Sequence, residues 1–407
     1  MKNNSFFSSA FSTARLFFAV NVLAGIGFNI GVVGVGWFII ASTGSNQLLG
    51  LYGALSLISA FITLAAAGAV MDKYAPLTLF RFCCAGQTGI FFLTALLSYF
   101  QLPARWLIYA LAVFNMPLMV LFSVVARRAV ASIWNNTSFT RGNAVLEITL
   151  QIGAMCAAVL TGVLYRFFGF SLLMGLAGAL CLSAALLLVK WPILMTNEAP
   201  HAAPFAEELR AGWVYLVQHK NALFYGLLAF IPTVIISASN TVIPGYVEQS
   251  LGKDALTYGL GDMWFAAGAL LAGLLGTRYE RLQTRVLLGL FGGVMACLGV
   301  LWLGRHTGLF YGMVFALGIG LAQLRILLNT LFMKKADSAY LGRSLSLLMA
   351  VSIGFQALLS YGVGGWMDKY GAASGFVWLL SLNVIGLILL GLARSPNNAG
   401  EKTSAAK

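Results

Sequence analysis

The chain has 407 residues, of which 60% are hydrophobic and only 9% are charged, and its mean hydropathy is +0.87. Soluble domains carry about 25% charged residues, so this composition excludes a soluble globular protein and predicts a membrane protein with room for about twelve spans. The net charge of +13 comes without any Lys/Arg-rich run, which argues against nucleic-acid binding and predicts loop cations that set membrane orientation.

Apolar runs in chain order predict twelve membrane-spanning helices, six on each side of a polar gap at 191–221. The runs lie at 16–40, 47–71, 77–99, 105–126, 144–165, 169–189, 222–247, 256–276, 286–303, 307–332, 344–366 and 373–393. We expect an all-α membrane protein with two six-helix pseudo-repeats as domains, at 1–190 and 222–394, and a tail at 395–407. The gap contains AEELRAGWVYLVQHK, in which Leu209, Trp213, Leu216 and Val217 share one helical face, so an amphipathic linker helix is expected.

The distribution of basic residues predicts the orientation of the chain. With both termini and the gap in the cytoplasm, 19 of the 25 lysines and arginines lie on the cytoplasmic side, five lie outside, and Arg325 remains within a span. The reverse orientation would break the positive-inside rule.

Short motifs recur at an interval of about half the chain. GAVMDKY at 68–74 ends the second span, and GLLGTRY at 273–279 ends the eighth, 205 residues later. This offset favours two parallel six-span repeats. A second Met-Asp-Lys-Tyr ends the eleventh span with Asp368 on the predicted outer face, in the slot that Arg166 occupies after the fifth span. Asp368 is therefore predicted to be an inverted, outer counterpart of Asp72.

This layout resembles the major facilitator superfamily, whose loop after span two reads approximately Gly-x-Leu-x-Asp-Arg-x-Gly-Arg-Arg. Gly68, Asp72 and Lys73 match this pattern, whereas Ala75 and Pro76 replace its later glycine and first basic residue. The resemblance covers nearly the whole chain. It implies a secondary transporter that works by alternating access, and Asp72 would then serve as a cytoplasmic gate.

Three further motifs are similar to the bacterial branch that contains the enterobactin exporter and macrolide efflux proteins. They are Arg141-Gly-Asn-Ala, Glu207-Glu-Leu-Arg-Ala-Gly and Leu341-Gly-Arg. This likeness implies proton-coupled export across a bacterial inner membrane, with both termini cytoplasmic. The fifth span lacks the Gly-Pro-x-x-Gly-Gly motif that drug antiporters commonly carry, which weakens the antiporter interpretation.

Asp72 is the predicted centre of a gating motif that includes Gly68, Lys73 and Arg141. A carboxylate at the end of the second span can accept hydrogen bonds from a helix N-terminus or from Arg141, which would hold the cytoplasmic side closed. The alternative is a solvated loop acid.

Asp262 and Glu147 are the candidates for proton coupling. Asp262 lies in the eighth span among small and aromatic residues, which favours a cavity wall, although an outer-vestibule acid is the alternative. Glu147 shares a face with Gln151 inside the fifth span and could carry a proton. It could equally be an interfacial acid paired with Arg127, Arg128 or Arg141.

Arg325 is the most unusual ionisable residue, because it lies inside the tenth span near Gln323 and Asn329. A permanent cation within a bundle suits an anionic substrate, such as a carboxylate-bearing metal chelator. A structural ion pair or snorkelling to the membrane edge are the alternatives. With Arg325, the candidates for lining the substrate cavity are the polar residues Asn29, Asn240, Gln151, Gln323 and Asn329.

No phosphate-binding loop, metal-ligand cluster or nucleophile triad is found in the sequence, so we expect no enzyme, no cofactor and no metal site. The expected partners are the lipid bilayer, a small-molecule substrate and a proton gradient, with the protein as a monomer and no nucleic acid. Siderophore export is the first prediction, drug or macrolide efflux the second and siderophore import the third. A non-transporting sensor or scaffold is the alternative from another class.

Overall fold

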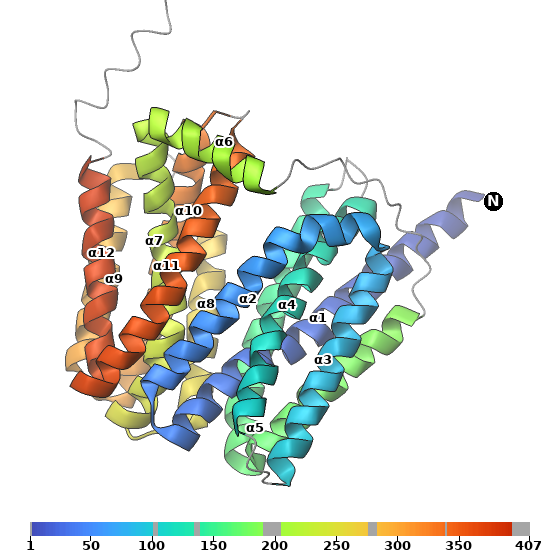
Figure 1. Cartoon of the computed structure of the whole chain (residues 1–407), viewed down its shortest axis with the longest axis horizontal. Coiled ribbons are helices and arrows are strands. Elements are labelled where there is room, and N and C mark those ends of the chain that lie inside the picture. The colour runs from blue at the N-terminus through green and yellow to red at the C-terminus, as the bar shows by residue number, and fades with distance from the viewer. Residues whose placement is uncertain are drawn as a thin grey trace, which may run out of the picture. The chain divides into compact units, whose positions relative to one another are not determined.

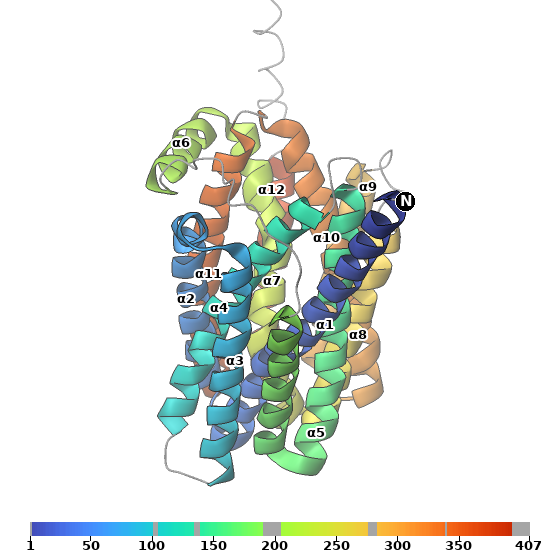
Figure 2. The same cartoon turned by 90° about the vertical axis from the view of Figure 1, so that its right-hand side faces the viewer.

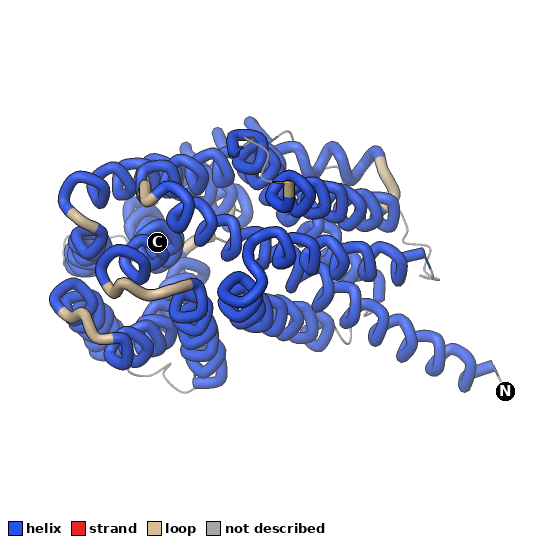
Figure 3. The backbone as a smooth tube through the Cα atoms, turned by 90° about the horizontal axis from the view of Figure 1, so that it is seen from below, coloured by secondary structure: helices blue, strands red, loops and turns tan. Residues whose placement is uncertain are grey.

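The computed structural model describes residues 2–100, 105–133, 139–189, 205–275, 283–337 and 340–392. Every regular element in these ranges is helical, joined by short turns (Figure 3). The helices are α1 (Lys2–Thr43), α2 (Asn46–Lys73), α3 (Pro76–Tyr99), α4 (Arg105–Ile133), α5 (Phe139–Val189), α6 (Phe205–Gln218), α7 (Lys220–Gly245), α8 (Ala255–Leu275), α9 (Gln283–Leu303), α10 (Thr307–Lys335), α11 (Leu341–Tyr370) and α12 (Gly375–Leu392).

Ten segments of the described chain are long and apolar enough to cross a membrane. Two features reconcile this number with the twelve predicted spans. One candidate segment, 145–189, contains both the fifth and the sixth predicted spans, and α8 lies at the eighth. The all-α prediction is therefore confirmed, and the chain is a multi-pass membrane protein.

Gly169 divides α5 into two arms. A straight helix of its 51 residues would be about 75 Å long, more than twice the hydrocarbon core of a bilayer. At Gly169 the backbone has φ 78° and ψ 179°, a conformation open to glycine and strained for other residues. The arms that meet there lie alongside each other in Figure 2.

Two compact units account for the chain. The first contains residues 1–43, 55–202 and 253–263, and the second contains 44–54, 203–252 and 264–407. The polar gap is thus not the only boundary between the two units, because the start of α2 belongs to the second unit and the start of α8 belongs to the first. The predicted domain boundaries at 190 and 222 stay a prediction.

Close helix packing and buried amides hold each unit together. In the first, α1 packs along α5, where Gly153 meets the backbone of Gly25, and the Gln87 amide donates to the side chain of Asn115 at 2.7 Å. In the second, α7 packs against α10, α11 and α12 (Figure 1). The Asn383 amide there donates to the Phe291 carbonyl at 2.9 Å. Such small residues and interhelical hydrogen bonds are what lipid-embedded bundles use in place of a hydrophobic driving force.

Candidate functional site

Arg325 lies on α10 at a position where the rest of the helical face is buried. Residues one and two turns away on that face, Leu321, Leu328 and Phe332, are fully buried, whereas Arg325 is exposed. A lipid-facing stripe would show exposed apolar neighbours instead. Arg325 is therefore exposed on a face of α10 that is otherwise buried.

The described residues support neither a structural ion pair nor snorkelling as the explanation of Arg325. Within the described ranges, no carboxylate forms an ion pair with its guanidinium. Snorkelling operates near helix ends, but ten residues, about 15 Å of helix, separate Arg325 from the end of α10 at Lys335. An exposed cation at this depth requires water or an anionic ligand.

Gln323 and Asn329, the predicted neighbours of Arg325, lie in different surroundings. The Gln323 side chain is 4% exposed and donates a hydrogen bond to the Ala272 carbonyl of α8 at 2.7 Å. This geometry makes Gln323 a packing residue between α10 and α8. Asn329 is half-buried one turn from Arg325 on α10.

Asp262 is half-buried on α8, beside a close helix–helix contact. At Gly259, one turn earlier, α8 approaches α5 so closely that a Cβ would meet the Ala158 carbonyl. In the described part of the chain, the Asp262 carboxylate forms neither an ion pair nor a hydrogen bond. An unpaired carboxyl group in a spanning helix is suited to take up and release a proton.

The other predicted polar residues are less suited to coupling. Glu147 is exposed and lies 3.9 Å from Arg127, with both side chains about 60% accessible (61% for Arg127 and 59% for Glu147), which matches the interfacial-acid alternative. The Asn29 amide donates to the Gly25 carbonyl within its own helix at 2.7 Å. Gln151 is half-buried and Asn240 is exposed.

The predicted cytoplasmic gate is only partly visible. The surroundings of Gly68 and the side chains of Asp72 and Arg141 lie outside what the structure describes. Lys73 is exposed in the last turn of α2, 5.4 Å from the centre of the Tyr74 ring. The Arg128 guanidinium of α4 donates to the Met71 carbonyl at 3.3 Å, so a cation does neutralise the end of α2.

At the other end of α2, Asp368 in the last turn of α11 holds the first turn of the helix. Its carboxylate accepts hydrogen bonds from the Ser45 hydroxyl (2.8 Å), the Asn46 backbone and side-chain N–H groups (2.7 and 3.0 Å) and the Gln47 backbone N–H (3.1 Å). The unpaired N–H groups and the positive end of the helix dipole favour a carboxylate here. We name this contact the α2–α11 clasp.

Glycines allow the α2–α11 clasp to form. A Cβ at Gly364 would meet the Asn46 carbonyl, and a Cβ at Gly50 would meet the Ser360 carbonyl. Gln249, in the π-helical turn after α7, also accepts a hydrogen bond from the Asn46 amide at 2.9 Å. Three segments that are distant in sequence thus meet at the start of α2.

The ion-pair partner of Arg166 was not predicted from the sequence. Arg166 lies 3.0 Å from Asp254, with both side chains about half exposed, and Gly162 lies against the backbone of Leu256. We name this contact the α5–α8 clasp. Asp254 also caps α8 by accepting the Thr257 N–H at 3.2 Å, as Ser45 caps α2 by accepting the Leu48 N–H at 3.2 Å. A capping residue ahead of an apolar run was a readable signal at both helix starts.

The described residues contain no group of three or more His, Cys, Asp or Glu side chains that could hold a metal ion. Arg325 of the second unit and Asp262 of the first each lie on a long apolar helix, and polar clasps lie at helix ends. Charged residues on membrane-spanning helices are typical of membrane transporters.

The family follows from comparison with known proteins. The profile of the Major Facilitator Superfamily matches residues 16–352, so the chain belongs to this superfamily. No curated protein matches the sequence at a significant level.

Solved structures of transporters share the fold over almost the whole chain. The nucleoside transporter NupG has a TM-score of 0.72 at 13% identity, covering 93% of this chain and 99% of its own. A bacterial homologue of the human lysosomal transporter Spinster, in an inward-facing form, has 0.68 at 14%, covering 94% and 95%. The peptide transporter POT in complex with sulfate has 0.71 at 14%, covering 96% and 94%. The TM-scores establish the shared fold, and the low sequence identities leave the substrate open.

Proposed function

We propose that this transporter exports a small anionic compound of the siderophore class across a bacterial inner membrane, coupled to proton movement. The main support for this proposal is that Arg325 is exposed on an otherwise buried face of a spanning helix. Its charge is permanent, and its planar donors match a carboxylate or a catecholate oxygen pair. The likeness of the Arg141, Glu207 and Leu341 motifs to the enterobactin-exporter branch supports the choice of compound.

Proton coupling is assigned to Asp262 in preference to Glu147. A carboxyl group can couple transport only if its protonation changes with its surroundings. Asp262 is half-buried in a spanning helix, whereas Glu147 is exposed beside Arg127. Solvent screening makes such surface pairs weak, so Glu147 is the poorer proton carrier.

Gating in this proposal uses both ends of α2. Asp72, with Gly68, Lys73 and Arg141, closes the cytoplasmic side, and Asp368 closes the outer side by holding the first turn of α2. Both termini are placed in the cytoplasm, and the protein acts as a monomer. The positive-inside distribution supports this orientation.

The test compares growth medium and cell contents by untargeted mass spectrometry in iron-poor medium. Four strains are used: a deletion mutant and the same mutant complemented with the natural protein, with Arg325→Ala or with Arg305→Ala. Arg305 is the matched control, because it is an exposed arginine outside the spanning helices. We expect an anionic chelator that is lost from the medium and accumulates in cells of the deletion and Arg325→Ala strains only.

Other outcomes would change the proposal in defined ways. A compound that stays in the medium and is missing from cells would identify an importer. A neutral or cationic compound, or full export by the Arg325→Ala strain, would contradict the role of Arg325. If the four strains differ only in drug susceptibility, the protein is a drug or macrolide efflux pump.

A further inference from the structure

Helix α6 lies across the ends of α7 and α11 in the second unit, and one face of it is fixed by packing (Figure 1). Gly212 brings the helix against the backbone of Arg343, where a Cβ would meet the Arg343 carbonyl. Leu216 is 1% exposed and Tyr215 is 6% exposed. This face leaves α6 little freedom to roll.

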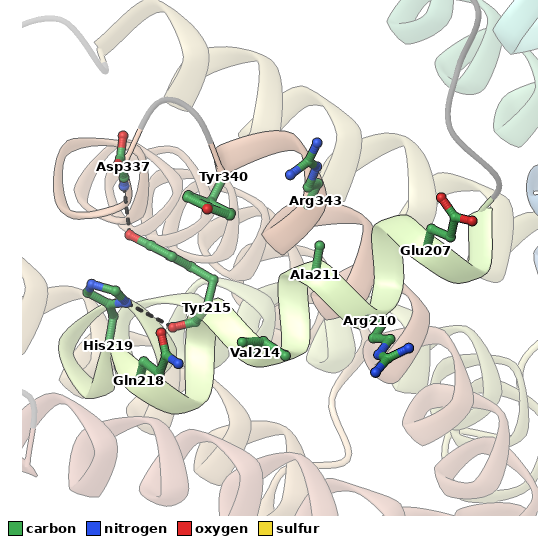
Figure 4. Close-up of a pocket in the computed structure, with 10 residues that line it drawn as sticks. All are labelled: Glu207, Arg210, Ala211, Val214, Tyr215, Gln218, His219, Asp337, Tyr340 and Arg343. Carbon is green, nitrogen blue, oxygen red and sulfur yellow. Dashed lines mark hydrogen bonds between the residues drawn. The ribbon is translucent and has the colours of Figure 1, made fainter.

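Tyr215 sets the rotation of α6 about its axis. Its ring stacks on Tyr340 at 4.9 Å with an interplanar angle of 7°, and on His219 at 4.3 Å with an angle of 21°. Its hydroxyl oxygen accepts the backbone N–H of Asp337 at 2.8 Å. Figure 4 shows this contact, with a pocket of about 480 Å³ between α6 and the start of α11.

The fixed rotation holds an apolar stripe outward. Arg210, Trp213, Val214 and Val217 follow the i, i+3, i+4, i+7 spacing of one helical face. The last three are 59%, 48% and 51% exposed. In Figure 4, Arg210 and Val214 project from the edge of α6 opposite Tyr340 and Arg343. A tryptophan and two valines are thus left without protein cover in the described structure.

Two observations identify what covers this stripe. First, α6 ends at Gln218 and the spanning helix α7 begins at Lys220, so the end of α6 lies where the chain meets the membrane surface. Second, exposed cations surround the helix: Arg210, Lys220, Lys334, Lys335 and Arg343. Only Glu207 and Asp337 are exposed acids in the described part of this region. An apolar stripe flanked by cations at a membrane surface is typical of an interfacial helix on anionic lipid.

We propose that the Arg210–Trp213–Val214–Val217 stripe of α6 docks into the headgroup region of the bilayer and prefers anionic phospholipid. Trp213 and Val217 insert at the headgroup level, where tryptophan is favoured, and Arg210 binds lipid phosphates. Through Tyr215, the docked helix also holds the start of α11. This inference needs only membrane residence and does not depend on the transported compound.

The test places a fluorophore on full-length protein in phosphatidylcholine nanodiscs with or without phosphatidylglycerol. Val217→Cys carries the label, with Cys156 and Cys297 replaced by alanine, and Lys253→Cys is the control in an exposed loop. Brominated lipid and aqueous iodide are the two quenchers. With phosphatidylglycerol, we expect the label at 217 to be quenched by brominated lipid and shielded from iodide, and the label at 253 to behave in the opposite way.

Arg210→Gln tests the charge preference without altering the apolar stripe. It should lower the ratio of docked to undocked helix about fivefold with phosphatidylglycerol and leave it unchanged in phosphatidylcholine alone. Equal iodide quenching at 217 and 253 would overturn the proposal. So would shielding that is the same in both lipids, or that occurs only after a soluble protein fraction is added, which would indicate a protein partner.

Discussion

Replacing Asp368 with asparagine should weaken the α2–α11 clasp and, in the proposed orientation, open the outer end of the transporter more often. Asp368 accepts four hydrogen bonds from Ser45, Asn46 and Gln47, two of them from backbone N–H groups. Asparagine removes the charge and turns an N–H group toward donors. Loss of a helix cap costs about 0.5–2 kcal/mol, and the partial exposure of Asp368 favours the middle of that range. A loss of about 1.4 kcal/mol raises the open fraction about tenfold.

Cysteine labelling measures this fraction directly. Ser360 is 3% exposed and lies against Gly50 and Gly53 of α2, so a Ser360→Cys thiol reacts with an impermeant maleimide only when α2 moves away. With Cys156 and Cys297 replaced, Asp368→Asn should raise the labelling rate about tenfold. Lys369→Gln removes a neighbouring exposed charge and should leave the rate unchanged. The native Cys181, fully buried in the first unit, reports general unfolding.

Two results would refute this reasoning. If Asp368→Asn and Lys369→Gln label at the same rate, the four hydrogen bonds do not hold the outer end. If Cys181 becomes reactive together with residue 360, the substitution unfolds the protein instead of opening a gate.

Three further predictions follow from other contacts. Arg166→Asp and Asp254→Arg should each increase the labelling rate of the Ser360→Cys thiol by up to about fivefold, because each breaks the exposed ion pair. The double swap should restore the original rate, and failure to do so would argue against the α5–α8 clasp. Asp262→Asn should abolish transport driven by a proton gradient in proteoliposomes, while substrate exchange without a gradient persists. Equal loss of both activities would exclude a specific coupling role for Asp262. Glu147→Gln should change transport less than about twofold, because its ion pair with Arg127 is exposed; a severe defect would restore Glu147 as the proton carrier.

The positions of the spanning helices were predictable because the bilayer dictates them. A span needs about 20 apolar residues, and the described residues of the twelve predicted runs lie in helices. The change of chain direction at Gly169 was harder to predict from the sequence. The sequence shows two apolar runs that meet there, but with 45 glycines in the chain, nothing marks this one as a glycine with positive φ.

The orientation of side chains about each helix was not predictable. Arg325 stands out in sequence because an ionisable residue interrupts an apolar run. Gln323, two residues away, was expected to face the same space, yet it is buried against Ala272 of α8. α10 is apolar on all sides, so the periodicity that reveals the buried face of a soluble helix is missing here.

The two clasps can be compared with the internal repeat that the sequence predicts. Asp368 and Arg166 occupy matching places after the eleventh and fifth spans, and each contacts the start of a helix, α2 or α8. Their chemistry differs, because Asp368 caps backbone N–H groups whereas Arg166 binds the carboxylate that itself caps α8. Salt screens an exposed ion pair more than a set of short hydrogen bonds to a helix N-terminus. The α5–α8 clasp should therefore weaken first as ionic strength rises, so the two clasps need not release together.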